Sequence, residues 1–182
     1  IRGASRPSSS CSGCPSSPRA RKDSLAPKRN LYLISLGCAK NLVDSEHILG
    51  LLKRRHFHVV ERIEEADLAI ISTCAFIQAA VEESVDTILE VSGEKRKGRL
   101  KGLFVVGCLV QRYGYKLQRE LPEVDGWLGT GEMGRIADLL QNWENPSTPF
   151  FHIGAPGSLA DHTMPRLGTA PFYSTYIKIA EG

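Results

Sequence analysis

The chain has 182 residues and a mass of 20.0 kDa, which suits one α/β domain of ordinary size with additional tails. No apolar run approaches the roughly 20 residues that span a bilayer, and no secretory signal is visible, so we expect a cytoplasmic protein without a membrane partner. The formal net charge is +3, but residues 1–29 hold seven of the 23 basic residues and one of the 20 acidic ones. The remaining chain is mildly acidic, which argues against direct nucleic-acid binding.

Residues 1–30 are predicted to be a disordered basic tail. The stretch is rich in Ser, Pro and Arg, and its large aliphatic residues are only Ile1 and Leu25. It therefore cannot bury enough apolar surface to become ordered. Its basic, acid-poor composition also resembles an organelle transit peptide, and this alternative stays open. Cys11 and Cys14 form half of a zinc motif without a second half nearby, so we expect them to bind no metal.

Three short apolar runs that each end on a cysteine organise the rest of the chain. They are residues 33–38, 69–74 and 103–108, which end on Cys38, Cys74 and Cys108. Each run is rich in β-forming residues, and helical periodicity follows each cysteine. The cysteines are 36 and then 34 residues apart, about one strand–helix–strand unit per step. Strands joined by crossover helices run parallel, so we expect the three thiols at the same edge of one sheet.

This pattern predicts a metal site made of three thiolates. Adjacent strands are about 5 Å apart, so three neighbouring strand ends span about 10 Å, which suits a cuboidal iron–sulfur cluster. Helix N-termini at that edge would favour the thiolate form that a metal ligand requires. The alternative is that the cysteines are buried as small apolar residues, although three at equivalent positions are hard to explain independently. A disulfide would use two of them and leave the third unpaired.

The remaining periodicity predicts a doubly wound α/β domain over residues 31–143. Strands are expected at 31–36, 57–60, 67–73, 102–107 and 124–128, and helices at about 43–55, from Cys74 to about 91, from Cys108 to Pro122 and over 132–143. Asp44 and Ser45 are candidate helix caps, and Ser92 with Gly93 is expected to end the second helix. The five parallel strands are predicted in the flavodoxin-like order 2-1-3-4-5, because that order makes the cysteine-bearing strands neighbours.

Residues 129–134 have the spacing G-x-G-x-x-G, which is also found in dinucleotide-binding loops. Here the pattern follows the last predicted strand instead of the first, and no acidic residue stands at a strand end about 20 residues later. We therefore interpret it as a glycine-rich turn before a helix, with no bound nucleotide.

The end of the chain is predicted to be a linker followed by an isolated strand. Residues 144–172 are rich in proline and glycine and show no sustained periodicity. Residues 173–182 then alternate like a strand that has no partner. We expect this strand to open a second domain that is missing, so the sequence reads as truncated.

Three motifs at the predicted edge resemble those of the radical-SAM methylthiotransferases. They are Gly-Cys-Ala-Lys-Asn-Leu-Val-Asp-Ser-Glu over 37–46, Thr-Cys-Ala-Phe-Ile over 73–77 and Gly-Cys-Leu-Val-Gln-Arg-Tyr over 107–113. The resemblance covers 31–143 and resumes at 173–182. The first motif is most similar to the branch that modifies an aspartate of a small-subunit ribosomal protein, whereas the branch that modifies a tRNA adenosine usually lacks it in this form.

The resemblance implies a [4Fe–4S] cluster on Cys38, Cys74 and Cys108, with one iron left open to hold the sulfur that is transferred. It also implies a second [4Fe–4S] cluster and a site for S-adenosylmethionine in a following barrel, so no catalytic residue is assigned to this chain. The implied partners are a small-subunit ribosomal protein as substrate and a sulfur donor. The alternatives are a fragment of a tRNA adenosine methylthiotransferase and a non-enzymatic module that binds an iron–sulfur cluster or zinc.

Overall fold

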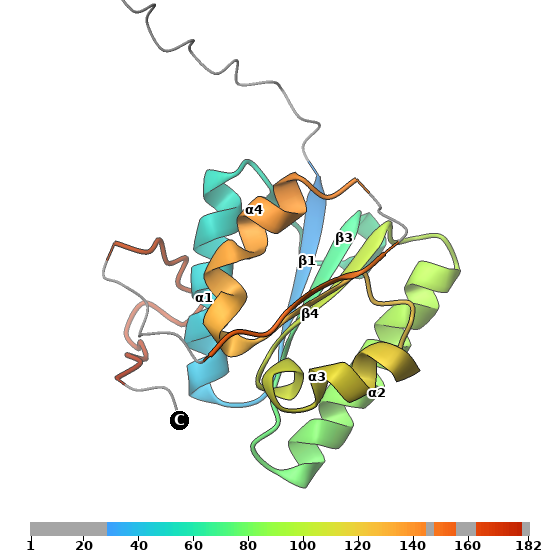
Figure 1. The fold of residues 1–182 in the computed structure, drawn as a ribbon. Coiled ribbons are helices and arrows are strands. Elements are labelled where there is room, and N and C mark those ends of the chain that lie inside the picture. Colours follow the sequence, from blue (N-terminus) through green and yellow to red (C-terminus); the bar gives the residue numbers. More distant parts are fainter. Residues whose placement is uncertain (1–28, 145–147, 156–162, 180–182) are drawn as a thin grey trace, which may run out of the picture.

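A parallel β-sheet lies between two pairs of helices, as the ribbon in Figure 1 shows. The computed structural model describes residues 29–144, 148–155 and 163–179. Its elements are β1 (Asn30–Ser35), α1 (Ala39–Arg54), β2 (His58–Val59), η1 (Ile63–Glu65), β3 (Leu68–Thr73), α2 (Gln78–Arg96), β4 (Gly102–Gly107), α3 (Cys108–Glu120), β5 (Gly126–Leu128), η2 (Thr130–Arg135), α4 (Ile136–Gln141) and β6 (Phe150–His152). Nearly all of the predicted tail, with Cys11 and Cys14, lies outside the described residues.

The sheet has the order β2-β1-β3-β4-β5-β6, and every pair of neighbours is parallel. The order of the first five strands is the predicted 2-1-3-4-5, so the doubly wound fold is confirmed. Every residue of β3 and β4 is buried. Strands covered on both faces have continuous apolar sequences, and this is the pattern from which they were predicted.

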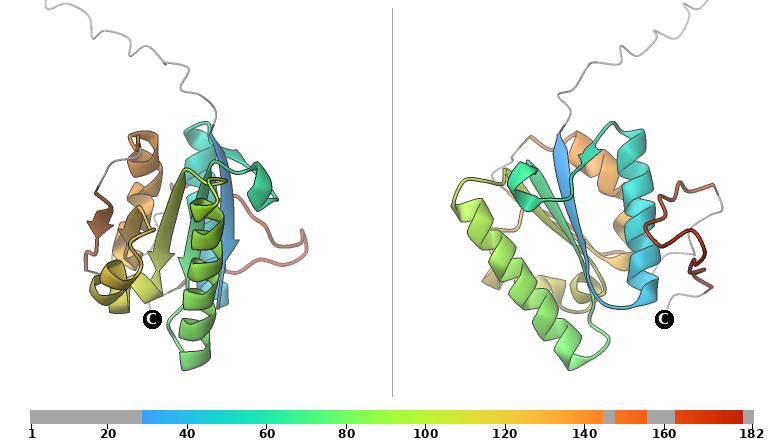
Figure 2. Two further views of the ribbon diagram at one scale, coloured as in Figure 1. Left: turned by 90° about the vertical axis from the view of Figure 1, so that its right-hand side faces the viewer. Right: turned by 180° about the vertical axis from the view of Figure 1, so that it is seen from behind.

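The two faces of the sheet pack against different helices. In β3, Ala69 and Ile71 belong to the core beneath α2 and α3, whereas Leu68 and Ile70 belong to the core beneath α1 and α4. This division follows from the alternation of side chains along a strand. Figure 2 shows the two helix pairs on opposite sides of the sheet. No helix in the described part of the chain is long and apolar enough to cross a membrane.

A sixth strand, β6, corrects the predicted count of five. It lies inside residues 144–172, which were predicted to be a linker, and it pairs with β5 so that Gly126 is opposite Phe150. The ring of Phe150 stacks on that of Phe104 at a centroid distance of 5.6 Å. A Cβ atom on Gly126 would lie only 2.1 Å from the Phe150 ring. The Phe150 ring thus fills the space that Gly126 leaves on the neighbouring strand. A strand of only three residues is too short for its alternation of apolar and polar residues to predict it.

The prediction that Ser92 and Gly93 end the second helix is wrong, because α2 continues to Arg96. Ser92 is fully buried. The Lys95 ammonium donates to the Glu123 carbonyl at 2.7 Å and to the Asp125 carboxylate at 2.5 Å. These long-range contacts stabilise a last turn whose sequence is typical of a loop.

The predicted helix caps at Asp44 and Ser45 are also wrong. α1 begins at Ala39, with Cys38 as its N-cap and no side-chain bond to cap it. Asp44 and Ser45 therefore lie well inside the helix, and both are buried. The Asp44 carboxylate accepts from Lys178, and the Ser45 hydroxyl donates to Ser35, so both side chains bond to residues outside the helix.

The predicted strand at the end of the chain is not formed in the described residues 173–179. This stretch is extended but pairs with no strand of the sheet. Together with residues 163–172 it lies beside α1, and we refer to residues 163–179 as the strap. It is the red segment to the left of α1 in Figure 1. A strand requires a neighbour for its backbone hydrogen bonds, and no described strand pairs with residues 173–179.

Candidate metal centre

The carboxyl ends of β1, β3 and β4 form the edge that carries the three predicted ligands, here called the cysteine edge. Cys74 and Cys108 directly follow Thr73 and Gly107, which are register partners on neighbouring strands. On the other side of β3, the Leu36 N–H extends the pairing of β1 by donating to the Ser72 carbonyl at 2.9 Å. Cys38 follows two residues later. The structure thus brings the three cysteines to one edge, as predicted.

The three thiols differ in their exposure. Cys38 is exposed, Cys108 is half-buried, and Cys74 is buried. The Cys74 backbone is held by Ser84, whose hydroxyl accepts from the Cys74 N–H at 3.2 Å and donates to its carbonyl at 3.1 Å. The cysteine edge therefore extends from the buried core at Cys74 to the protein surface at Cys38.

Two glycines allow the cysteine loops to approach one another. Gly37 has a φ of +86°, and a Cβ atom there would lie 2.8 Å from the Cys74 sulfur. Gly107 has a φ of +104°, and its Cβ would lie 2.7 Å from the Thr73 carbonyl oxygen. Both positions need glycine for conformation and for space. The Gly-Cys pairs at 37–38 and 107–108 thus have a structural cause.

Asn41 connects the loops that carry the three cysteines. Its side chain is 1% exposed, and its amide donates to the Leu36 carbonyl at 2.9 Å and to the Thr73 carbonyl at 2.8 Å. Its amide oxygen lies 3.8 Å from the Cys108 sulfur, as a weak acceptor. This role of Asn41 was not predicted, because nothing in the local sequence pattern shows that the side chain of a helical asparagine bonds to the carbonyls at the ends of two strands.

The electrostatic environment of the edge links the three sulfurs. Burial raises the pKa of the Cys108 thiol, the positive charge of Lys40 acts in the opposite direction, and Cys74 and Cys38 add to the rise. Such mutual influence requires the thiols to be near one another. α1 and α3 begin at the edge, so the positive ends of their dipoles point to it. The expectation that each cysteine opens a helix fails only for Cys74, because α2 starts at Gln78.

Among the described residues, no group of three His, Cys, Asp or Glu side chains is gathered tightly enough to hold a single metal ion. A mononuclear zinc site needs four ligands at about 2.0–2.3 Å, and only three thiols meet at this edge. The three thiols at this edge are therefore one ligand short of a structural zinc site.

The glycine pattern at 129–134 forms a turn of 3-10 helix, η2, in place of a nucleotide loop. The Gly129 N–H donates to the His152 carbonyl at 2.8 Å, and the Thr130 N–H donates to the Gln111 side chain at 3.1 Å. These backbone donors are not free to hold a phosphate. The predicted helix over 132–143 is regular only from Ile136 to Gln141.

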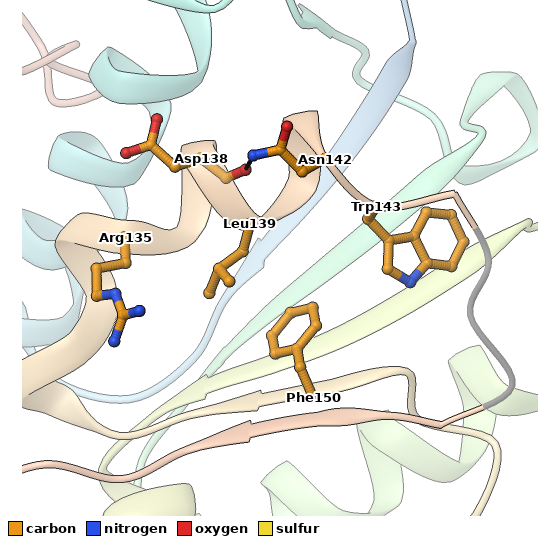
Figure 3. Close-up of a pocket in the computed structure, with 6 residues that line it drawn as sticks. All are labelled: Arg135, Asp138, Leu139, Asn142, Trp143 and Phe150. Carbon is orange, nitrogen blue, oxygen red and sulfur yellow. Dashed lines mark hydrogen bonds between the residues drawn. The ribbon is translucent and has the colours of Figure 1, made fainter.

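A separate open cavity of about 450 Å³ lies between α4 and β6. Figure 3 shows six residues that line it, among them the aromatic rings of Trp143 and Phe150, the Asp138 side chain on α4 and Asn142 just after that helix. Trp143 also contacts Gly102 at the beginning of β4, at the opposite end of that strand from Cys108. The cavity is therefore not part of the cysteine edge.

Comparison with known proteins places this fold in a family. The family described as "Uncharacterized protein family UPF0004" matches residues 30–129, which is more than half of the chain. The chain belongs to the UPF0004 family. The match includes β1 to β5 and all three cysteines of the edge.

Several curated relatives of this UPF0004 chain carry the name "Ribosomal protein uS12 methylthiotransferase RimO". The protein from Syntrophotalea carbinolica is 48% identical over 155 residues, which is 85% of this chain and 34% of the relative. That from Geotalea uraniireducens is 46% identical over 85% of this chain and 35% of the relative. That from Symbiobacterium thermophilum is 45% identical over 82% of this chain and 30% of the relative. The predicted resemblance to methylthiotransferases of the ribosomal-protein branch is confirmed, and the chain spans about a third of these relatives' length.

Proposed function

We propose that this chain is the cluster-binding part of a methylthiotransferase that acts on an aspartate of a small-subunit ribosomal protein. The observation that carries the proposal is the meeting of three free thiols at the ends of adjacent strands, joined by Asn41. The names of the relatives supply the reaction and the class of substrate. The proposal includes a sulfur donor as a further partner and a cytoplasmic location.

Cys38, Cys74 and Cys108 would hold a [4Fe–4S] cluster. When bound, that cluster would supply one iron without a protein ligand, at which the sulfur to be transferred is held. The chain's own residues would fix the ligands: Ser84 holds the backbone of Cys74, and Asn41 holds the loops before Cys38 and Cys74 together. The exposed Cys38 leaves the edge accessible from outside.

The remaining chemistry would belong to other parts of a longer protein. Relatives are about three times as long as the matched region, which leaves room for a barrel with a second [4Fe–4S] cluster and S-adenosylmethionine. Phe76 and Ile77 follow Cys74 after the buried Ala75, and they are 86% and 58% exposed. An exposed apolar pair at the cysteine edge is typical of a surface that another domain or the substrate covers.

Iron binding by the purified chain tests the proposal. After anaerobic reconstitution we expect about four irons per chain, as in a [4Fe–4S] cluster. Cys38→Ala, Cys74→Ala and Cys108→Ala should each remove most of the iron, because two thiolates cannot retain the cluster.

The matched control is the double variant Cys11→Ala with Cys14→Ala, which should keep the full iron content. Loss of iron in this control, together with full retention in the three single variants, would show that the ligands were wrongly assigned. Metal analysis also separates the alternative module, since one zinc per chain and no iron would contradict the proposal.

A further inference from the structure

Two acidic side chains of α1 are buried, although the candidate metal centre does not use them as ligands. Glu46 is fully buried and Asp44 is 6% exposed. A carboxylate is costly to bury unless a positive charge and hydrogen bonds compensate for the lost water. All the side-chain partners of Glu46, and the hydrogen-bond donor to Asp44, come from the strap.

Glu46 is bound by two residues at the beginning of the strap. The Arg166 guanidinium contacts one carboxylate oxygen through Nε at 2.7 Å and Nη2 at 2.6 Å. The other oxygen accepts the Thr169 N–H at 2.6 Å and the Thr169 hydroxyl at 3.0 Å. Both oxygens of the buried Glu46 carboxylate are thus satisfied, one of them by a charge-assisted bond from Arg166, whose side chain is 26% exposed.

Asp44 is bound by the other end of the strap. The Lys178 ammonium donates to its Oδ1 at 2.7 Å, and the two side chains are 7% and 5% exposed. The second oxygen of Asp44 lies 3.7 Å from the Lys40 ammonium. This pair is thus shielded from solvent, unlike a surface ion pair.

The backbone of the strap also approaches α1 closely. The Leu167 N–H donates to the Glu46 carbonyl at 3.0 Å. A Cβ atom on Gly50 would lie 2.5 Å from the Pro165 carbonyl oxygen, so the contact at that point requires glycine. The strap therefore runs from Gly50 toward Asp44, that is, toward the N-terminus of α1.

Apolar burial does not hold the second half of the strap in place. Phe172, Ile177 and Ile179 are 101%, 79% and 85% exposed, whereas Lys178 between the two isoleucines is buried. This arrangement reverses the usual pattern, in which apolar side chains face inward and charges face solvent. The two ion pairs, together with the backbone contacts of Pro165 and Leu167, therefore hold the strap on α1.

We propose that Glu46–Arg166 and Asp44–Lys178 form a two-point latch that holds the strap along α1 and directs it toward the cysteine edge. Asp44 lies six residues after Cys38, the N-cap of α1, which corresponds to about 9 Å along a helix. The latch residues are positioning residues: they fix the strap's path and contact neither substrate nor cluster. In a protein as long as the relatives, a following domain would start from a point fixed close to the three thiols.

Hydrogen exchange on the 182-residue chain tests the latch without iron, so its outcome is independent of the proposed function. In Glu46→Gln, Arg166→Gln and Lys178→Gln we expect the strap amides, above all those of Leu167 and Thr169, to exchange at least about tenfold faster. Amides of β3 and β4 should be unchanged. The control is Arg55→Gln, which removes an exposed ion pair between α1 and Asp138 and should leave the strap unchanged.

Two further variants separate a latch from general destabilisation. Gly50→Ala should release the Pro165 end of the strap by steric contact, while alanine favours the helix itself. Lys178→Arg should restore the slow exchange that Lys178→Gln loses, because arginine keeps the charge. The proposal would be overturned if the strap amides exchanged within about twofold of their rate in the unmodified chain in all three of these variants: Glu46→Gln, Lys178→Gln and Gly50→Ala. Because Arg166 and Lys178 lie outside the sheet and its helices, their variants give an answer even if Glu46→Gln fails to fold.

Discussion

The Asn41 side chain bonds to the loops before Cys38 and Cys74 and also contacts Cys108. Asn41→Leu has a similar volume but removes the side-chain donor to one buried carbonyl, that of Thr73, and to one part-buried carbonyl, that of Leu36. We expect the free energy of unfolding to fall by about 1–3 kcal/mol, because unsatisfied buried acceptors are costly. We also expect the reconstituted chain to lose iron faster to a chelator, since the loops would no longer be held together. Urea unfolding and chelation kinetics measure the two effects.

Asn142→Leu is the matched control for this prediction. Asn142 is exposed and donates only to a carbonyl of its own helix, so its loss should change the free energy of unfolding by less than about 0.5 kcal/mol. Equal effects of the two variants would mean that Asn41 has no special role at the cysteine edge.

At the scale of elements, β6 extends the sheet through one aromatic contact. Phe150 is half-buried and stacks on Phe104, above the space left by Gly126. Phe150→Ala should lower the free energy of unfolding by about 2–3 kcal/mol, at or just below the range for a fully buried phenylalanine. Denaturant unfolding checks this value. Phe172→Ala removes a fully exposed ring of the strap and should cost less than about 0.5 kcal/mol; if both variants behave alike, β6 contributes nothing to the sheet.

For the whole molecule, two buried or half-buried carboxylates predict a loss of stability in acid. Burial acts to raise the pKa of the Glu46 carboxyl, but hydrogen bonds from Thr169 and Arg166 hold it below its ordinary value. A hydrogen bond from Lys101 lowers the pKa of Asp67, against burial, with the Asn30 N–H as a further donor. Because both groups have lowered pKa values in the folded protein, the stability they add is complete above their unfolded-state values.

We therefore expect the free energy of unfolding to begin to fall as the pH drops below the unfolded-state values of about 4, and the loss to end below the folded-state values. Asp67→Asn should flatten part of this slope, and Glu46→Gln should flatten another part. Urea unfolding between pH 6 and pH 3 measures the slopes. Identical pH profiles in the unmodified chain and in both variants would contradict this assignment.

The sequence by itself determined the sheet order and the meeting of the three cysteines. Continuous apolar runs such as 69–74 are specific to strands buried on both faces, and crossover connections leave little freedom in where their ends lie. The position of Cys38, Cys74 and Cys108 at one edge therefore follows from local pattern and chain topology alone.

The tertiary structure alone decided the features that depend on contacts between distant residues. Asp44 and Glu46 look like ordinary polar residues of a helix, and only the strap, more than 110 residues later, explains why they are buried. The last turn of α2 and the strand β6 depend in the same way on Asp125 and Phe104. The periodicity of a sequence predicts which face of a helix or strand is apolar, but it does not predict which distant charged group or aromatic ring packs against that element.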